Sequence, residues 1–247
     1  MNLLIDAGNT RIKWALAEAG RDSWLDSGIL PVEQASGLAQ FFAACLDRLG
    51  IDSRSTQIWA SNVAGKEVAQ HIRNINTGHP PEFVVAREAQ CGVRNGYSSV
   101  AQLGSDRWAA LITAWHRVHN ECLVVGCGTA TTIDTLSRHG EFLGGLILPG
   151  VELMQRSLRN ATAQLQPEQG KYTPLPSNTA DALLSGAIQA SCGAIERQYA
   201  LLGNTDAPVL LGGGAATQIA PHLNLPVQIV DNPVLQGLLL IAQEAGA

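Results

Sequence analysis

The chain has 247 residues, of which 46% are hydrophobic and 15% are charged, and its formal net charge is −5. This length and apolar content predict a folded protein of one large domain or two smaller ones, and they exclude a disordered chain. The acidic balance argues against broad binding to nucleic acid or to an anionic membrane, because both require a concentrated basic surface.

The five cysteines form no C-x-x-C pair, and their number is odd. This usage is typical of reduced thiols in a cytoplasmic protein and indicates neither a disulfide framework nor a zinc site. We expect no signal peptide, because Asp6 interrupts the first apolar run too early. The apolar stretch from Val234 to Ala242 is too short to span a bilayer.

The opening segment, MNLLIDAGNTRIKWAL, predicts a β-hairpin with a polar turn. An apolar strand ends in Asp6, and Gly8 and Asn9 tolerate positive φ, so the turn can place backbone N–H groups around an anion. Asp6 can then orient a metal ion that the anion carries. An ordinary tight hairpin in which Asp6 caps the turn explains the same residues.

The rest of the first half is expected to continue as strand, helix, strand, helix and strand, ending in a strong helix. The expected elements are a strand at 23–30, a helix at 38–49, a strand at 57–60, a helix at 64–74 capped by Ser61 or Asn62, a short strand at 82–85, a polar loop at 93–99 and a helix at 103–118 that begins at Gly104 or Ser105. This order gives the first half an α/β pattern.

The second half repeats the opening pattern of strand, glycine turn, strand and strand. We expect strands at 122–125, 130–136 and 141–148 with a glycine turn at 126–129, a helix from Pro149-Gly150, a helix at 179–202, a strand at 209–211, a glycine turn at 212–214, a strand at 227–230 and a helix at 233–245. The repetition predicts a duplicated topology of two mixed sheets, with the glycine turns lining one cleft.

Short motifs spread along the whole chain carry a family resemblance. They are D-A-G-N-T at 6–10 with Lys13, S-N-V at 61–63, N-G-Y at 95–97, L-G-S-D-R-W at 103–108, G-T-A-T-T-I-D at 128–134, G-G-L-I-L-P-G at 144–150, N-T-A-D-A-L-L-S-G at 178–186, L-G-G-G at 211–214 and D-N-P-V-L-Q-G-L at 231–238. In this order they closely resemble the type III pantothenate kinases of the ASKHA superfamily (acetate and sugar kinases, heat-shock chaperone ATPases and actin).

The resemblance implies an α/β fold of two topologically duplicated, ribonuclease H-like (actin-like) halves with mixed sheets and flanking helices around a cleft. The halves would be residues 1–118, with the first phosphate loop and the pantothenate-binding segment, and residues 119–247, with the second phosphate loop, the adenosine side and the C-terminal helix. The implied activity is transfer of the ATP γ-phosphoryl group to the primary hydroxyl of pantothenate, the first step of coenzyme A biosynthesis. A cytoplasmic homodimer that uses ATP with Mg²⁺ or another divalent cation, and binds neither nucleic acid nor membrane, is expected.

On the nucleotide side, the resemblance assigns the opening turn to the phosphates of ATP. The residues carried over are Asp6, Ala7, Gly8, Asn9, Thr10, Arg11, Ile12 and Lys13, with Thr129 in the second glycine turn. Asp6 would hold the Mg²⁺ shell, because phosphoryl transfer depends on positioning and charge neutralisation. Lys13 on its own would be read as an exposed strand residue. Gly144, Gly145 and the Pro149-Gly150 turn would border the adenosine.

On the substrate side, the resemblance makes Asp106 the general base, within a binding segment that also includes Gly104 and Ser105. Arg107 would receive the pantothenate carboxylate, for which a guanidinium fork is suited, and Tyr97 would contact the substrate. Thr179 would reach it from the partner subunit.

Each of these four side chains also has a structural explanation. Asp106 suits the positive end of a helix dipole, and Arg107 would otherwise form a surface ion pair. Tyr97 could be a loop aromatic that packs on the core, and Thr179 could be the N-cap of the long helix.

One position departs from the family pattern. Many members carry an Asp two residues before the glycine of G-T-A-T-T, where it is a ligand of an activating K⁺ or NH₄⁺, and Gly126 stands there in this chain. Since glycine offers only a backbone carbonyl, we expect weak or absent K⁺ dependence.

Two other functions are compatible with the fold: a non-catalytic accessory or regulatory ASKHA protein, and an ASKHA kinase with another hydroxylated substrate. The presence of Asp6, Asp106 and Arg107 disfavours the first, and the N-G-Y and G-S-D-R motifs disfavour the second. Cys127, in a glycine turn, could in principle be a nucleophile, but phosphoryl transfer here needs no covalent intermediate.

Overall fold

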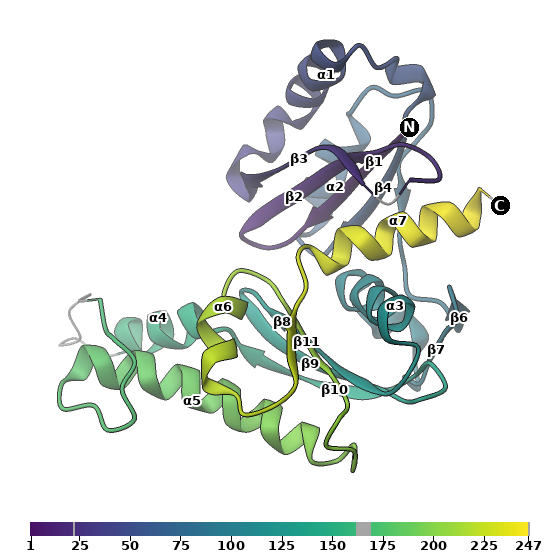
Figure 1. Ribbon diagram of the computed structural model, residues 1–247. Coiled ribbons are helices and arrows are strands. Elements are labelled where there is room, and N and C mark those ends of the chain that lie inside the picture. The colour runs from purple at the N-terminus through teal and green to yellow at the C-terminus, as the bar shows by residue number, and fades with distance from the viewer. Residues whose placement is uncertain (22, 162–168, 247) are drawn as a thin grey trace. The chain divides into compact units, whose positions relative to one another are not determined.

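The computed structural model describes residues 1–21, 23–161 and 169–246 (Figure 1). Two compact units make up the chain. The first combines Met1–His116 with Pro233–Ala247, and the second is Arg117–Asn232. Each unit contains a mixed sheet with helices packed on it, as an α/β fold requires.

The first unit is built on a sheet with the strand order β3-β2-β1-β4-β5. Its strands are β1 (Asn2–Ala7), β2 (Arg11–Ala17), β3 (Trp24–Pro31), β4 (Gln57–Asn62) and β5 (Glu82–Phe83). β1 and β2 form the expected antiparallel hairpin, β3 extends it, and β4 lies parallel to β1. β1 is therefore the central strand, and its residues have neighbours on both sides.

Helices α1 (Leu38–Leu49) and α2 (Lys66–Arg73) cover one face of this sheet. Phe42 of α1 and Ile72 of α2 are fully buried in one cluster with Leu3, Ile5 and Ala7 of β1. Since successive side chains of a strand point to opposite faces, Leu4 and Asp6 belong to the other face.

Helix α7 (Pro233–Ala245), drawn in yellow in Figure 1, packs on β1, β2 and β4 of the same unit. It crosses α3 (Ser105–Val118) closely, because a Cβ at Gly237 would lie 2.0 Å from the Ala109 carbonyl oxygen. The expectation that the C-terminal helix belongs with the second half is corrected here: tertiary packing places it with the first unit.

Five strands of the second unit repeat the same sheet plan, in the order β10-β9-β8-β11-β12, within a seven-stranded sheet that also includes β7 (Val93–Asn95) and β6 (Ala89–Gln90) beyond β10. The five strands are β8 (Cys122–Cys127), β9 (Ala130–Leu136), β10 (Glu141–Pro149), β11 (Val209–Gly212) and β12 (Val227–Ile229). β8 and β9 are antiparallel, as are β9 and β10, and β11 runs parallel to both β8 and β12. The topological duplication predicted from the sequence is confirmed for these five strands.

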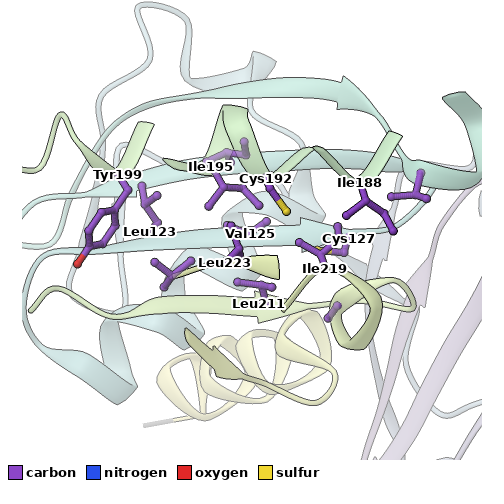
Figure 2. Packing of buried hydrophobic residues seen from close by; sticks show 14 of the residues in the cluster. Leu123, Val125, Cys127, Ile188, Cys192, Ile195, Tyr199, Leu211, Ile219 and Leu223 are labelled. Carbon is purple, nitrogen blue, oxygen red and sulfur yellow. The ribbon is translucent and has the colours of Figure 1, made fainter. Parts of the chain in front are cut away.

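The helices of the second unit are α4 (Val151–Ala161), α5 (Thr179–Tyr199) and the short α6 (Ala216–Ile219). Figure 2 shows Ile188 and Ile195 of α5 facing Val125 of β8 and Leu211 of β11, and all four are buried in one cluster. Among the described residues, no helix is long and apolar enough to cross a membrane.

Three local expectations are corrected. The N-cap of α2 is Gly65, which makes no side-chain cap bond, while Asn62 Oδ1 accepts instead from the Ala64 amide at 3.1 Å. The expected loop at 93–99 contains β7 (Val93–Asn95), paired with an unforeseen β6 (Ala89–Gln90). Positive φ at both turn residues, Cys91 and Gly92, closes this hairpin. Finally, α6 was not expected.

Candidate functional site

The turn between β1 and β2 is short and exposed at its tip. The Gly8 amide donates to the Arg11 carbonyl at 3.0 Å, and Asn9 and Thr10 are exposed. Neither Gly8 nor Asn9 has a positive φ, so the turn closes without the left-handed backbone that the sequence suggested. Ala7 and Ile12 bury their side chains in the core, which leaves only their backbone for any ligand.

Three polar side chains form a row across β2, β1 and β4. Lys13 pairs with Asp6, and Asp6 pairs with Ser61. Paired residues of neighbouring strands present their side chains on the same face, and this is the face opposite α1 and α2. Ser61 is fully buried, whereas Asp6 and Lys13 are partly buried.

Asp6 sits in an environment that opposes its ionisation. Burial raises the pKa of its carboxyl from 3.8 to about 7; the Lys13 charge lowers it, and the Asp106 charge raises it. The two carboxylates are therefore close enough to interact. A cation bound nearby would stabilise the ionised carboxylate of Asp6. Asp6 therefore fits the role of a ligand of Mg²⁺, which favours carboxylate oxygen.

Within the described ranges, no three His, Cys, Asp or Glu side chains are arranged to hold a metal ion by themselves.

The start of α3 presents Asp106. Its Oδ1 accepts from the Arg107 backbone amide at 2.8 Å, which fixes the carboxylate against its own helix. A Cβ at Gly104 would lie 2.6 Å from the same oxygen. Glycine at 104 thus leaves the space that the carboxylate occupies. Ser105, the first residue of α3, turns its hydroxyl toward Ser61, with 2.9 Å between the two oxygens.

Arg107 and Tyr97 are brought together as the sequence predicted. The Arg107 Nη1 donates to the Tyr97 hydroxyl at 2.9 Å, and the guanidinium carbon lies 5.6 Å from the ring centroid. The Tyr97 amide donates to Asn95 Oδ1 at 3.0 Å, which anchors the loop. Arg107 is only 6% exposed. The Arg107 side chain therefore does not lie on the surface, where the alternative of a surface ion pair would put it.

In the second unit, a tight turn at Gly128 and Thr129 joins β8 to β9. The Gly128 amide donates to the Ala130 carbonyl at 3.0 Å, and the Gly150 amide to the Thr129 carbonyl at 2.8 Å. A Cβ at Gly150 would lie 2.1 Å from the Gly128 carbonyl oxygen, and one at Gly213 would lie 2.5 Å from that of Cys127. Two of the three expected glycine turns therefore meet here, with Thr129 exposed.

Two further expectations concern Cys127 and Thr179. Burial raises the pKa of the Cys127 thiol to about 12, with a smaller contribution from Cys192, so it stays protonated and is a poor nucleophile. Thr179 is exposed at the first position of α5, but the N-cap is Asn178, whose side chain accepts from the Asp181 amide at 2.9 Å. The alternative of Thr179 as the cap is wrong.

Gly126 occupies β8, where it pairs with Thr132 of β9 and Gly212 of β11. A Cβ at this position would lie 2.7 Å from Thr132 Oγ1. A side chain here would have to displace that hydroxyl.

Ser61 is the residue whose contacts the sequence did not reveal. The available signal was a small polar residue at the end of an apolar strand, within the S-N-V motif. Its partner, Ser105, lies 44 residues away, and only the tertiary fold brings them together.

The duplicated sheets, with a glycine turn after the first strand of each unit and Asp6 at the first of these turns, define the class as an α/β protein of two topologically duplicated units. The solved structures agree. A Campylobacter jejuni protein described as a Baf family transcriptional activator is 21% identical, with a TM-score of 0.63 over 99% of this chain and 98% of that one. An inorganic polyphosphate/ATP-glucomannokinase from an Arthrobacter species is 16% identical, with a TM-score of 0.52 over 99% of this chain and all of the other.

Sequence comparison identifies the family. The type III pantothenate kinase family model matches residues 2–201. A type III pantothenate kinase from Nitrosospira multiformis is 47% identical, over 98% of this chain and 91% of the relative. The chain belongs to the type III pantothenate kinase family.

Proposed function

We propose that this protein phosphorylates pantothenate, transferring the γ-phosphoryl group of ATP to the primary hydroxyl to give 4'-phosphopantothenate, the first step of coenzyme A biosynthesis in the cytoplasm. The observation that carries the proposal is the placement of Asp6 at the end of β1 and Asp106 at the start of α3, where the charge of Asp106 contributes to the raised pKa of Asp6. Two carboxylates in different surroundings can take different roles in one reaction.

We assign Asp6 to the divalent metal. Mg²⁺, when bound with ATP, would neutralise charge on the phosphates. The Gly8–Thr10 backbone and Arg11 follow Asp6 on the adjoining turn, which is exposed from Asn9 to Arg11, and there they can meet phosphate oxygens. Lys13, the cross-strand neighbour of Asp6, contributes a positive charge to the same place.

We assign Asp106 to the substrate hydroxyl. In a loose phosphoryl-transfer transition state, orientation of the hydroxyl matters more than its early deprotonation. A carboxylate is therefore a sufficient base. The bond from the Arg107 amide holds the Asp106 carboxylate in one orientation, and Gly104 leaves room for it.

The carboxylate of pantothenate is assigned to Arg107, assisted by Tyr97. A guanidinium presents its donors in a planar fork that matches a carboxylate. The bond to the Tyr97 hydroxyl fixes the guanidinium before substrate binds, which reduces the entropy lost on binding.

In the second unit, we assign Thr129 to ATP phosphate, since it lies exposed in a tight turn that is the topological counterpart of the Gly8 turn. Thr179, exposed on α5, is proposed to reach the substrate of the partner subunit in a homodimer. We propose that the enzyme works without an activating K⁺, because Gly126 has no side-chain ligand.

A coupled assay of ADP release, run with and without pantothenate, tests the proposal. ADP release should depend on pantothenate, and Asp106→Asn should lower kcat by about 10²-fold to 10⁴-fold, the usual contribution of a positioned base. Asp47→Asn removes an exposed carboxylate of α1 and should leave the rate unchanged. Turnover without pantothenate would contradict the substrate, and an undiminished rate in Asp106→Asn would contradict the base.

A further inference from the structure

Two buried serine hydroxyls face each other between β4 and α3. The Oγ atoms of Ser61 and Ser105 are 2.9 Å apart, and the residues are 0% and 9% exposed. Helix α7 also packs on β1, β2 and β4 of this sheet. A hydrogen bond in such surroundings is strong and directional, because little water competes for either hydroxyl.

Each serine adjoins one of the two carboxylates assigned to the reaction. Ser61 is the parallel-strand partner of Asp6. Ser105 is the first residue of α3 and directly precedes Asp106. The hydroxyl bond therefore connects the strand beside Asp6 to the helix turn that carries Asp106.

The Asp106 carboxylate has a local constraint but needs a second one. The Arg107 amide fixes the carboxylate relative to its own helix, but this bond does not fix the helix relative to the sheet. The Ser61 to Ser105 bond is the side-chain hydrogen bond that ties the first residue of α3 to the end of β4.

We propose that Ser61 and Ser105 form a positioning pair that holds the start of α3 against β4 and so sets the distance between Asp106 and Asp6. This inference rests on the proposed kinase function. Because both hydroxyls are buried against each other, they act through Asp106 and not on the substrate. Reacting groups must be held to within a fraction of an ångström for efficient transfer, and a directional bond supplies this where apolar contact would not.

The test is a double-mutant cycle that measures Tm, kcat and KM in Ser61→Ala, Ser105→Ala and the double variant. Each single variant leaves one buried hydroxyl without its partner, which should lower Tm by a few degrees, on the order of 3 °C. The double variant replaces both hydroxyls by apolar groups, so its Tm should return close to that of the wild type.

The kinetic expectation differs from the expectation for stability. All three variants should lose about tenfold in kcat, since a misplaced group costs rate, while KM for pantothenate and for ATP stays within about twofold. The double variant would then be stable but slow. Ser191→Ala is the matched control: Ser191 is also fully buried, and its hydroxyl donates to the Ala187 carbonyl within α5 at 2.9 Å. That variant should keep the wild-type kcat.

A double variant that recovers kcat together with Tm would overturn the proposal, because the pair would then be structural only. A loss expressed only as a higher KM would also overturn it, since the hydroxyls would then serve binding. Failure of the proposed function is distinguishable from both, because it would appear in the wild type as ADP release that does not depend on pantothenate.

Discussion

Replacement of Asp6 by Asn is expected to stabilise the protein at neutral and alkaline pH while it abolishes activity. In the folded protein the pKa of this carboxyl is raised from 3.8 to about 7, chiefly by burial. Asn has nearly the same shape and cannot ionise. The variant therefore removes the cost of burying a charge but also removes the proposed metal ligand.

The direction in which the free energy of unfolding changes with pH follows from proton binding to Asp6. Between the unfolded and the folded pKa, the folded state holds a proton on Asp6 that the unfolded state has lost, so the wild-type free energy of unfolding falls as pH rises. The full effect is 1.36 kcal/mol for each of about three pKa units, or about 4 kcal/mol. About 2.6 kcal/mol of this falls between about pH 5 and about pH 8.

Chemical denaturation of both proteins at these two pH values, without Mg²⁺ or ATP, measures the effect. The stability advantage of Asp6→Asn over the wild type should grow by about 2.6 kcal/mol from the lower to the higher pH, because contributions shared by the two proteins cancel. ADP release by Asp6→Asn should be lost at both pH values. A stability advantage that does not change with pH would refute the inference that the ionised Asp6 carboxylate destabilises the folded protein.

Asp52→Asn is a control whose stability relative to the wild type should change with pH in the opposite direction. Asp52 is exposed, and its hydrogen bonds from Arg54 hold the pKa of its carboxyl below the ordinary value. A lowered pKa favours the folded state as pH rises through the acid range. Relative to the wild type, this variant should therefore become slightly less stable on going from acid to neutral pH, and it should remain active.

Three further predictions concern the same site. Gly104→Ala should push the Asp106 carboxylate from its place, since the new Cβ would lie 2.6 Å from Oδ1, and kcat should fall while Tm changes little. Arg107→Lys should raise KM for pantothenate by about tenfold or more, because an ammonium cannot reproduce the guanidinium fork; an unchanged KM would contradict the assignment. Replacement of K⁺ and NH₄⁺ by Na⁺ should leave the rate unchanged, because Gly126 offers no carboxylate; a collapse of the rate would contradict this.

The element order was largely determined by the sequence itself. Helix α1 begins and ends where its apolar spacing predicts, and so does α7. The strand, turn, strand and strand pattern at the start of each half was also sufficient to predict the duplicated sheets. These features depend on local periodicity and turn residues, which are visible without knowledge of distant contacts.

Elements with weak periodicity were harder to predict. β6 and β7 have only 2 and 3 residues, too few for an alternating pattern. Their hairpin also depends on positive φ at Cys91, a residue that does not signal such a turn. The place of α7 could not be read from its amphipathic pattern, because that pattern marks which face is buried but not the partner against which it packs.

Some residues of the candidate site could likewise be recognised from the sequence, and others only from the tertiary structure. The motifs around Asp6, Asp106, Arg107 and Tyr97 were recognisable in the sequence, but their number and order carried the resemblance, not any one of them. Only the tertiary structure placed Ser61 beside Asp6, through the parallel pairing of β1 with β4, and opposite Ser105 at the start of α3. Strand register and helix docking depend on contacts between distant segments, and these contacts determine the burial, the raised pKa of Asp6 and the hydroxyl pair.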